Sequence, residues 1–156
     1  MNNQTRQQLP RKFSLRRLEQ QGPRGQRKDA LARARSGSIL CLCLDTERSQ
    51  DPSGLPIMEV GVIASKKQVS KKAVRRNCAK RRIRAALREL DAKRFEQILE
   101  EQGLTRVRIL FVCSKDCLTL EFPQLIQNLN LSLLRVLLSL KHSEGGQHGS
   151  APKSSE

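Results

Sequence analysis

Three short apolar runs alternate along the chain with segments in which apolar residues recur every three or four positions. The runs at 38–44, 57–64 and 107–113 have the length and the polar boundaries of buried strands. A segment rich in Asp, Pro, Ser and Gly separates the first two runs, as is typical of turns. We therefore expect the first two strands to form an antiparallel pair.

Helical spacing predicts three helices, at 73–90, 94–102 and 122–140. On a wheel of 100 degrees per residue, the apolar positions of the first helix fill an arc of about 100 degrees, wide enough to bury against a sheet. These positions are Ala79, Ile83, Ala86, Leu87 and Leu90. Short strands mixed with helices indicate an α+β fold with two layers.

The ends of the chain differ from this central region. Residues 1–38 hold ten Lys or Arg and only two acids, which predicts a basic arm with a short helix at 11–19. The Gly- and Ser-rich residues 142–156 are expected to be a disordered tail. We divide the chain into a basic tail at 1–8, one domain at 9–141 and that second tail.

A cationic stripe lies beside the apolar arc of the helix at 73–90. Residues 65–88 contain eleven Lys or Arg and no acid. Like charges four positions apart destabilise an isolated helix by a few tenths of a kcal/mol per pair, so a counter-charge is expected, and phosphate is the obvious one. The stripe consists of Asn77, Lys80, Arg81, Arg84 and Arg88.

The net charge of +15 supports an anionic partner. Nucleic acid is the first candidate and an anionic membrane surface the second. No stretch approaches the roughly 18–20 apolar residues that span a bilayer, and the apolar arc of the basic helix is too narrow to insert well. Five cysteines without a secretion signal favour reduced thiols in a cytosol.

A specific motif lies in the same basic segment. Ser65-Lys66-Lys67 ends a predicted strand, and the helix from Ala73 to Arg84 reads AVRRNCAKRRIR. This segment resembles the ribonuclease P protein family, whose helix carries the pattern Ala-Val-x-Arg-Asn-x-x-Lys-Arg-x-x-Arg. Every fixed position of that pattern is matched. Looser, collinear similarity extends over roughly residues 9–140.

The resemblance implies a small two-layer α/β sandwich with a mixed sheet and a left-handed βαβ crossover, the fold of the second domain of ribosomal protein S5. It also implies the protein component of the endoribonuclease that removes the 5′ leader from precursor tRNA. In that enzyme the RNA subunit performs the cleavage with RNA-bound Mg²⁺, and the protein supplies no catalytic residue and no metal ligand. The implied partners are the catalytic RNA, bound one to one, and precursor tRNA, in the cytoplasm.

Contact with the catalytic RNA is implied for the basic helix and the loop before it. The residues are Ser65, Lys66, Lys67, Lys71, Lys72, Arg76, Asn77, Lys80, Arg81, Arg84 and Arg88. Phe13 would lie in the cleft that holds the leader. The loop at 68–72 is about two residues longer than usual, and aromatics expected near Arg17 and Leu42 are missing. This favours leader recognition through backbone charge rather than stacking.

The sequence is also compatible with other classes of protein and with a metal site. A general RNA- or DNA-binding module, such as a ribosomal accessory protein, would carry the same stripe. A nuclease in its own right would need acidic or histidine chemistry, yet both histidines, His142 and His148, fall in the predicted tail. The cysteines at 41, 43, 113 and 117 allow a zinc site, although small buried thiols would have the same spacing.

Overall fold

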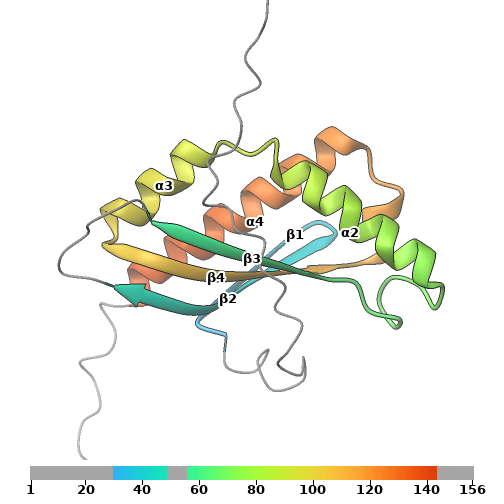
Figure 1. Cartoon of the computed structure of the whole chain (residues 1–156), viewed down its shortest axis with the longest axis horizontal. Coiled ribbons are helices and arrows are strands. Elements are labelled where there is room, and N and C mark those ends of the chain that lie inside the picture. Colours follow the sequence, from blue (N-terminus) through green and yellow to red (C-terminus); the bar gives the residue numbers. More distant parts are fainter. Residues whose placement is uncertain (1–29, 49–55, 144–156) are drawn as a thin grey trace, which may run out of the picture.

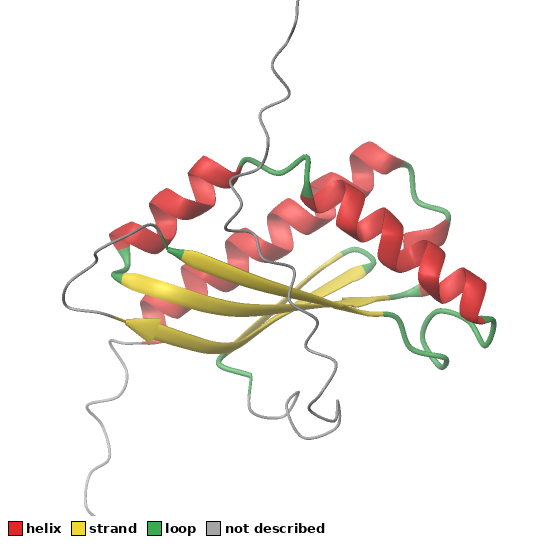
Figure 2. Ribbon diagram, in the orientation of Figure 1, coloured by secondary structure: helices red, strands yellow, loops and turns green. Residues whose placement is uncertain are grey.

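The computed structural model describes residues 30–48 and 56–143, which form a four-stranded sheet covered on one face by helices (Figure 2). The strands are β1 (Ala32–Ser36), β2 (Ile39–Arg48), β3 (Ile57–Ile63) and β4 (Leu104–Cys113). The helices are α2 (Ala73–Leu87), α3 (Ala92–Glu101), the short 3-10 helix η1 (Lys115–Leu118) and α4 (Phe122–Ser143). The predicted α+β sandwich of two layers is confirmed.

The sheet is mixed, with the strand order β1-β2-β4-β3. β4 pairs antiparallel with β2 and parallel with β3. Because β3 and β4 are parallel, the chain returns between them through α2 and α3, which both lie on the helical face (Figure 1). With β3 nearer the viewer than β4, this connection is left-handed, as the resemblance implied. Nearly all such connections in proteins have the opposite hand.

The expected antiparallel pair of the first two apolar runs is wrong, because β4 lies between β2 and β3. The reason is the apolar run of β4. Its residues from Ile109 to Val112 are all buried, so β4 needs cover on both faces and a strand on each side. β4 therefore occupies the centre of the sheet and separates the two strands that are closest in sequence.

β1 lies where the sequence predicted only a basic arm. Ala32 and Ala34 pack with the core on the helical side, whereas Arg33 and Arg35 are exposed. This alternation of small and charged residues has the period of a strand. A tight turn at Gly37, whose φ of 54° favours glycine, reverses the chain into β2. The predicted helix at 11–19 and the predicted tail at 1–8 lie outside the described residues.

The main core fills the space between the sheet and the helices. Spacing predicted eight apolar positions on helix α4, and six of them are buried: Leu125, Leu129, Leu133, Val136, Leu137 and Leu140. Ile126 is only partly buried, and Phe122, at the start of the helix, is 36% exposed. Phe111 from β4 and Phe95 from α3 are fully buried beside the buried residues of α4.

Helix α3 is capped at both ends. Asp91 is its N-cap, and the Asp91 carboxylate accepts a hydrogen bond from the backbone N–H of Arg94 at 3.4 Å. Gly103 follows the end of the helix with a φ of 68°. None of the described helices has the length and apolarity to cross a membrane.

Candidate nucleic-acid interface

Helix α2 is divided lengthwise into a buried seam and a cationic ridge, as its sequence predicted. The seam residues Ala79, Ile83 and Ala86 are fully buried, and Leu90 stays buried although the helix ends at Leu87. The ridge, defined as Asn77, Lys80, Arg81, Arg84 and Arg88, is exposed or half-buried along its whole length. The predicted orientation of the helix is therefore confirmed.

No carboxylate within residues 30–48 and 56–143 forms an ion pair with the ridge. The ion pairs of this region join Glu47 and Glu59 to arginines of β4. The five ridge side chains also make no hydrogen bond within the same ranges. Their charge therefore stays directed outward, which suits contact with a polyanion.

The loop at 65–72, between β3 and α2, has a defined shape. The hydroxyl of Ser65 accepts a hydrogen bond from the N–H of Gln68 at 3.1 Å, and that of Ser70 accepts one from the N–H of Lys72 at 3.2 Å. Val69 is buried in the main core and fixes the middle of the loop. Within this loop the four lysines are exposed, and they are Lys66, Lys67, Lys71 and Lys72.

The N-terminus of α2 has no acidic partner within the helix. Lys72 occupies the N-cap without a side-chain hydrogen bond to the helix, and the first turn contains no acid. The first N–H groups of a helix carry partial positive charge and normally attract Ser, Asp or Glu. Lysines at this end therefore add positive charge next to these partially positive N–H groups. Binding of an external anion would reduce the resulting repulsion.

Two arginines of α2 bond to the backbone of the protein itself. Nη1 of Arg76 donates to the carbonyls of Ser70 at 3.0 Å and Lys71 at 2.7 Å. Nη1 of Arg82 donates to the carbonyl of Cys117 at 2.7 Å, and its Nη2 donates to the carbonyl of Leu120. Arg82 thus ties α2 to the connection between β4 and α4. The sequence had assigned Arg76 to the RNA contact and had given Arg82 no role.

The face of the sheet opposite the helices is partly apolar. Leu42, Leu110 and Val112 are buried there, with Leu40 and Ile63 packed against them. No aromatic side chain of the described strands belongs to this cluster, since Phe111 packs on the helical side. Leu42 is thus on the expected face without the expected ring. Phe13, predicted for the leader cleft, lies outside the described residues.

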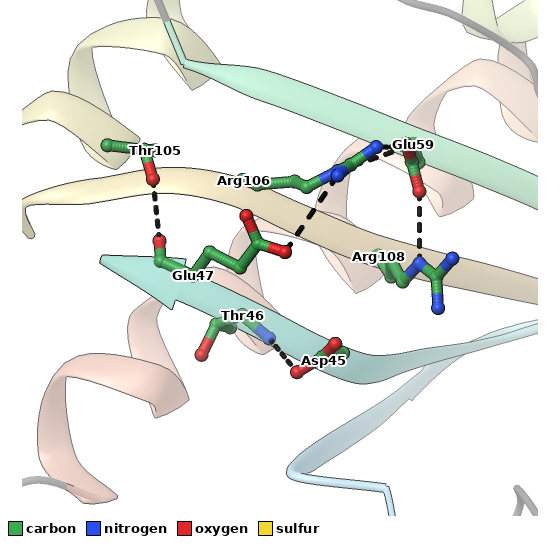
Figure 3. Close-up of polar contacts among 7 residues, drawn as sticks. All are labelled: Asp45, Thr46, Glu47, Glu59, Thr105, Arg106 and Arg108. Carbon is green, nitrogen blue, oxygen red and sulfur yellow. Dashed lines mark hydrogen bonds and ion pairs between the residues drawn. The ribbon is translucent and has the colours of Figure 1, made fainter. Parts of the chain in front are cut away.

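A buried carboxylate organises the other end of this face (Figure 3). Glu59 of β3 is only 4% exposed and accepts hydrogen bonds from Arg106 and Arg108 of β4, the second at 3.0 Å. Glu47 of β2 lies 3.8 Å from the same Arg106 guanidinium. Burial opposes ionisation of Glu59, but the hydrogen bonds and charges of Arg108 and Arg106 outweigh it and lower the pKa of Glu59. The sequence analysis had missed this network.

The cysteines expected as a possible zinc site lie in the core. Cys41, Cys43, Cys113 and Cys117 are buried and Cys78 is exposed on α2. In the described part of the chain, no three His, Cys, Asp or Glu side chains are grouped so that they could hold a metal ion. No step is therefore assigned to a metal on these residues.

One known protein family has a model that matches most of this chain. The chain matches the family described as Ribonuclease P over residues 26–137, well over half of its length, and it belongs to that family. No curated protein matches it. Among solved structures it is similar to the RNase P protein of Staphylococcus aureus, with 16% sequence identity and a TM-score of 0.43, covering 72% of this chain and 87% of that one.

The chain is accordingly a protein subunit of ribonuclease P. It takes part in tRNA processing within a ribonucleoprotein endonuclease, with an RNA subunit and a tRNA substrate as partners.

The anchoring role of Arg82 can be measured against a neighbour. Arg82→Met removes two charge-assisted hydrogen bonds and leaves two carbonyls without their donor, so we expect a loss of about 1–3 kcal/mol in the free energy of unfolding. Arg81→Met makes the same chemical change on the exposed ridge and should alter stability by less than about 0.5 kcal/mol. Urea unfolding followed by circular dichroism measures both, and equal unfolding midpoints would contradict the assignment.

The Glu59 network should be visible in the pH dependence of stability. Because the pKa of Glu59 is lower in the folded than in the unfolded protein, its ionised form adds stability above the unfolded value of about 4.3, and this contribution is lost as the pH falls. Glu59→Gln cannot titrate. We expect the urea midpoint of the wild type to fall further than that of Glu59→Gln between pH 7 and pH 3. Parallel pH profiles would show that Glu59 is not held in its ionised form.

Proposed function

We propose that the ridge of α2 and the lysines of the loop at 65–72 form the surface that binds the catalytic RNA of ribonuclease P. The observation that supports this most directly is the uncompensated charge of the ridge, since no carboxylate of the described residues forms an ion pair with it. Each arginine of the ridge can bind a phosphate through two N–H donors, and Lys80 contributes a point charge. These arginines are Arg81, Arg84 and Arg88. Asn77 can donate or accept within the same surface and so fix orientation.

In this proposal the protein acts through charge and the RNA performs the cleavage. Mg²⁺ would be bound by the RNA, and one protein would bind one RNA in the cytoplasm. Cations on the protein lower the repulsion between the phosphates of the catalytic RNA and those of the precursor tRNA. The binding equilibrium then depends on salt, because each neutralised phosphate releases condensed counterions.

We further propose that the 5′ leader of precursor tRNA lies along the face of the sheet that carries Leu42 and Leu110. That face lacks an aromatic ring in the described strands, and Arg33 and Arg35 of β1 are exposed. Base stacking is correspondingly weak there, and Leu42 and Leu110 are themselves buried, so phosphate contacts with exposed cations would hold a single strand.

Reconstitution with a bacterial catalytic RNA and precursor tRNA tests the function. The wild-type protein should stimulate cleavage at physiological salt. Lys80→Gln with Arg84→Gln should weaken binding to the catalytic RNA and make the slope of log affinity against log salt shallower by about 0.7–0.9 for each lost phosphate contact. Filter binding at several salt concentrations measures affinity and slope together.

A matched control removes the same charge from another surface. Lys93 and Arg94 are exposed on α3, where acidic residues are frequent, so Lys93→Gln with Arg94→Gln should leave affinity and slope near the wild-type values. Equal losses in the two double variants would contradict a specific ridge and indicate general attraction by net charge. RNA binding without stimulation of cleavage would instead indicate a general RNA-binding protein, and cleavage by the protein alone would indicate a nuclease.

A further inference from the structure

Arg76 differs from the ridge residues in what its side chain contacts. It is half-buried at the border between the seam and the ridge, and Nη1 donates to the two adjacent carbonyls of Ser70 and Lys71. Arg81, which lies on the exposed ridge, has no partner among the described residues. The two arginines share a helix and a charge, but only one of them is engaged by the protein.

The loop that Arg76 holds has few other links to the rest of the domain. Both serine hydroxyls bond to backbone N–H groups within the loop, and Val69 is the residue that anchors it in the core. Arg76 therefore connects the second half of the loop to the body of α2. Four exposed lysines on one short loop repel one another, so the loop needs such a connection to keep a single shape.

We infer that Arg76 is a positioning residue, which aligns the lysines of the loop at 65–72 with the ridge before RNA binds. The inference rests on the proposed binding of the catalytic RNA by α2. It reassigns Arg76, because the two carbonyls of its own chain that hold Nη1 tie the side chain to the loop, so that its main role is to order the surface. Without it the loop lysines still reach phosphate, but they must be ordered during binding, which weakens affinity without changing the number of contacts.

The dependence of affinity on salt distinguishes a positioning residue from a phosphate contact. We expect Arg76→Met to lower affinity for the catalytic RNA by about tenfold at every salt concentration, with a slope parallel to that of the wild type. Arg81→Met, which removes a phosphate contact, should make the slope shallower by about 0.7–0.9. In the free protein, the amides of Gln68 and Lys72 should exchange with solvent at least about tenfold faster in Arg76→Met and at the wild-type rate in Arg81→Met.

Each contrary result has a defined meaning. A shallower slope with unchanged amide exchange in Arg76→Met would overturn the inference and make Arg76 a direct phosphate contact. Faster exchange with unchanged affinity would overturn it by showing that loop order does not matter for binding. If the wild type did not bind the catalytic RNA, the proposed function and this inference would both fall, although the exchange rates would still report the anchoring. Arg76→Gln, measured in parallel, provides a second variant should Arg76→Met not fold.

Discussion

The burial of one narrow apolar seam on α2 determines what this molecule presents to a partner. Ala79, Ile83 and Ala86 are fully buried against the sheet and its neighbouring helices. Rolling the helix to either side would carry a cation such as Lys80 toward the core, where an unpaired charge is strongly unfavourable. The helix has one acceptable orientation, and the outward direction of the ridge follows from it. The orientation of the proposed RNA-binding surface is thus fixed by packing on the opposite side of the helix.

Local sequence patterns predicted the helices, but they did not predict which strands pair in the sheet. The arcs of α2 and the apolar positions of α4 follow from helical geometry, so the sequence predicted them correctly except at Phe122, which is exposed, and Ile126, which is only partly buried. The neighbours of β3 could not be found in this way, because strand pairing depends on which strand most needs cover, and that was β4 with its run from Ile109 to Val112. β1 was missed because Arg33 and Arg35 were counted as charge before their alternation with alanine was considered.

The residues of the candidate site divide in the same way: those that depend on local spacing were predicted, and those that depend on contacts with other segments were not. Residues on the outward arc of α2 were identified from composition and spacing alone. The roles of Arg76 and Arg82 depend on carbonyls in other segments, up to 38 residues away for Arg82, and no local pattern marks a carbonyl as an acceptor. Glu59 was also missed, because its two arginines come from a strand 47 and 49 residues further along the chain.

The cationic side chains of β4 and of α2 differ in whether a carboxylate pairs with them. On the face of the sheet opposite the helices, Arg106 and Arg108 share a buried carboxylate and are held in place. On α2 the cations of the ridge have no such partner among the described residues. The contrast shows that the domain compensates positive charge where the strands require it. The cations of the ridge, by contrast, keep their charge exposed or half-exposed to solvent.

The left-handed connection has a consequence for how the chain reaches its native state. The segment that joins the parallel strands β3 and β4 contains α2, the most cationic of the described helices. The two strands can pair only when this whole segment has folded back over the sheet. Closure over such a sequence separation is slow, and self-repulsion of the lysines and arginines slows it further at low ionic strength. Any polyanion that binds the helix favours closure by mass action. If α2 binds the catalytic RNA as proposed, that RNA would also stabilise the folded form of its own protein subunit.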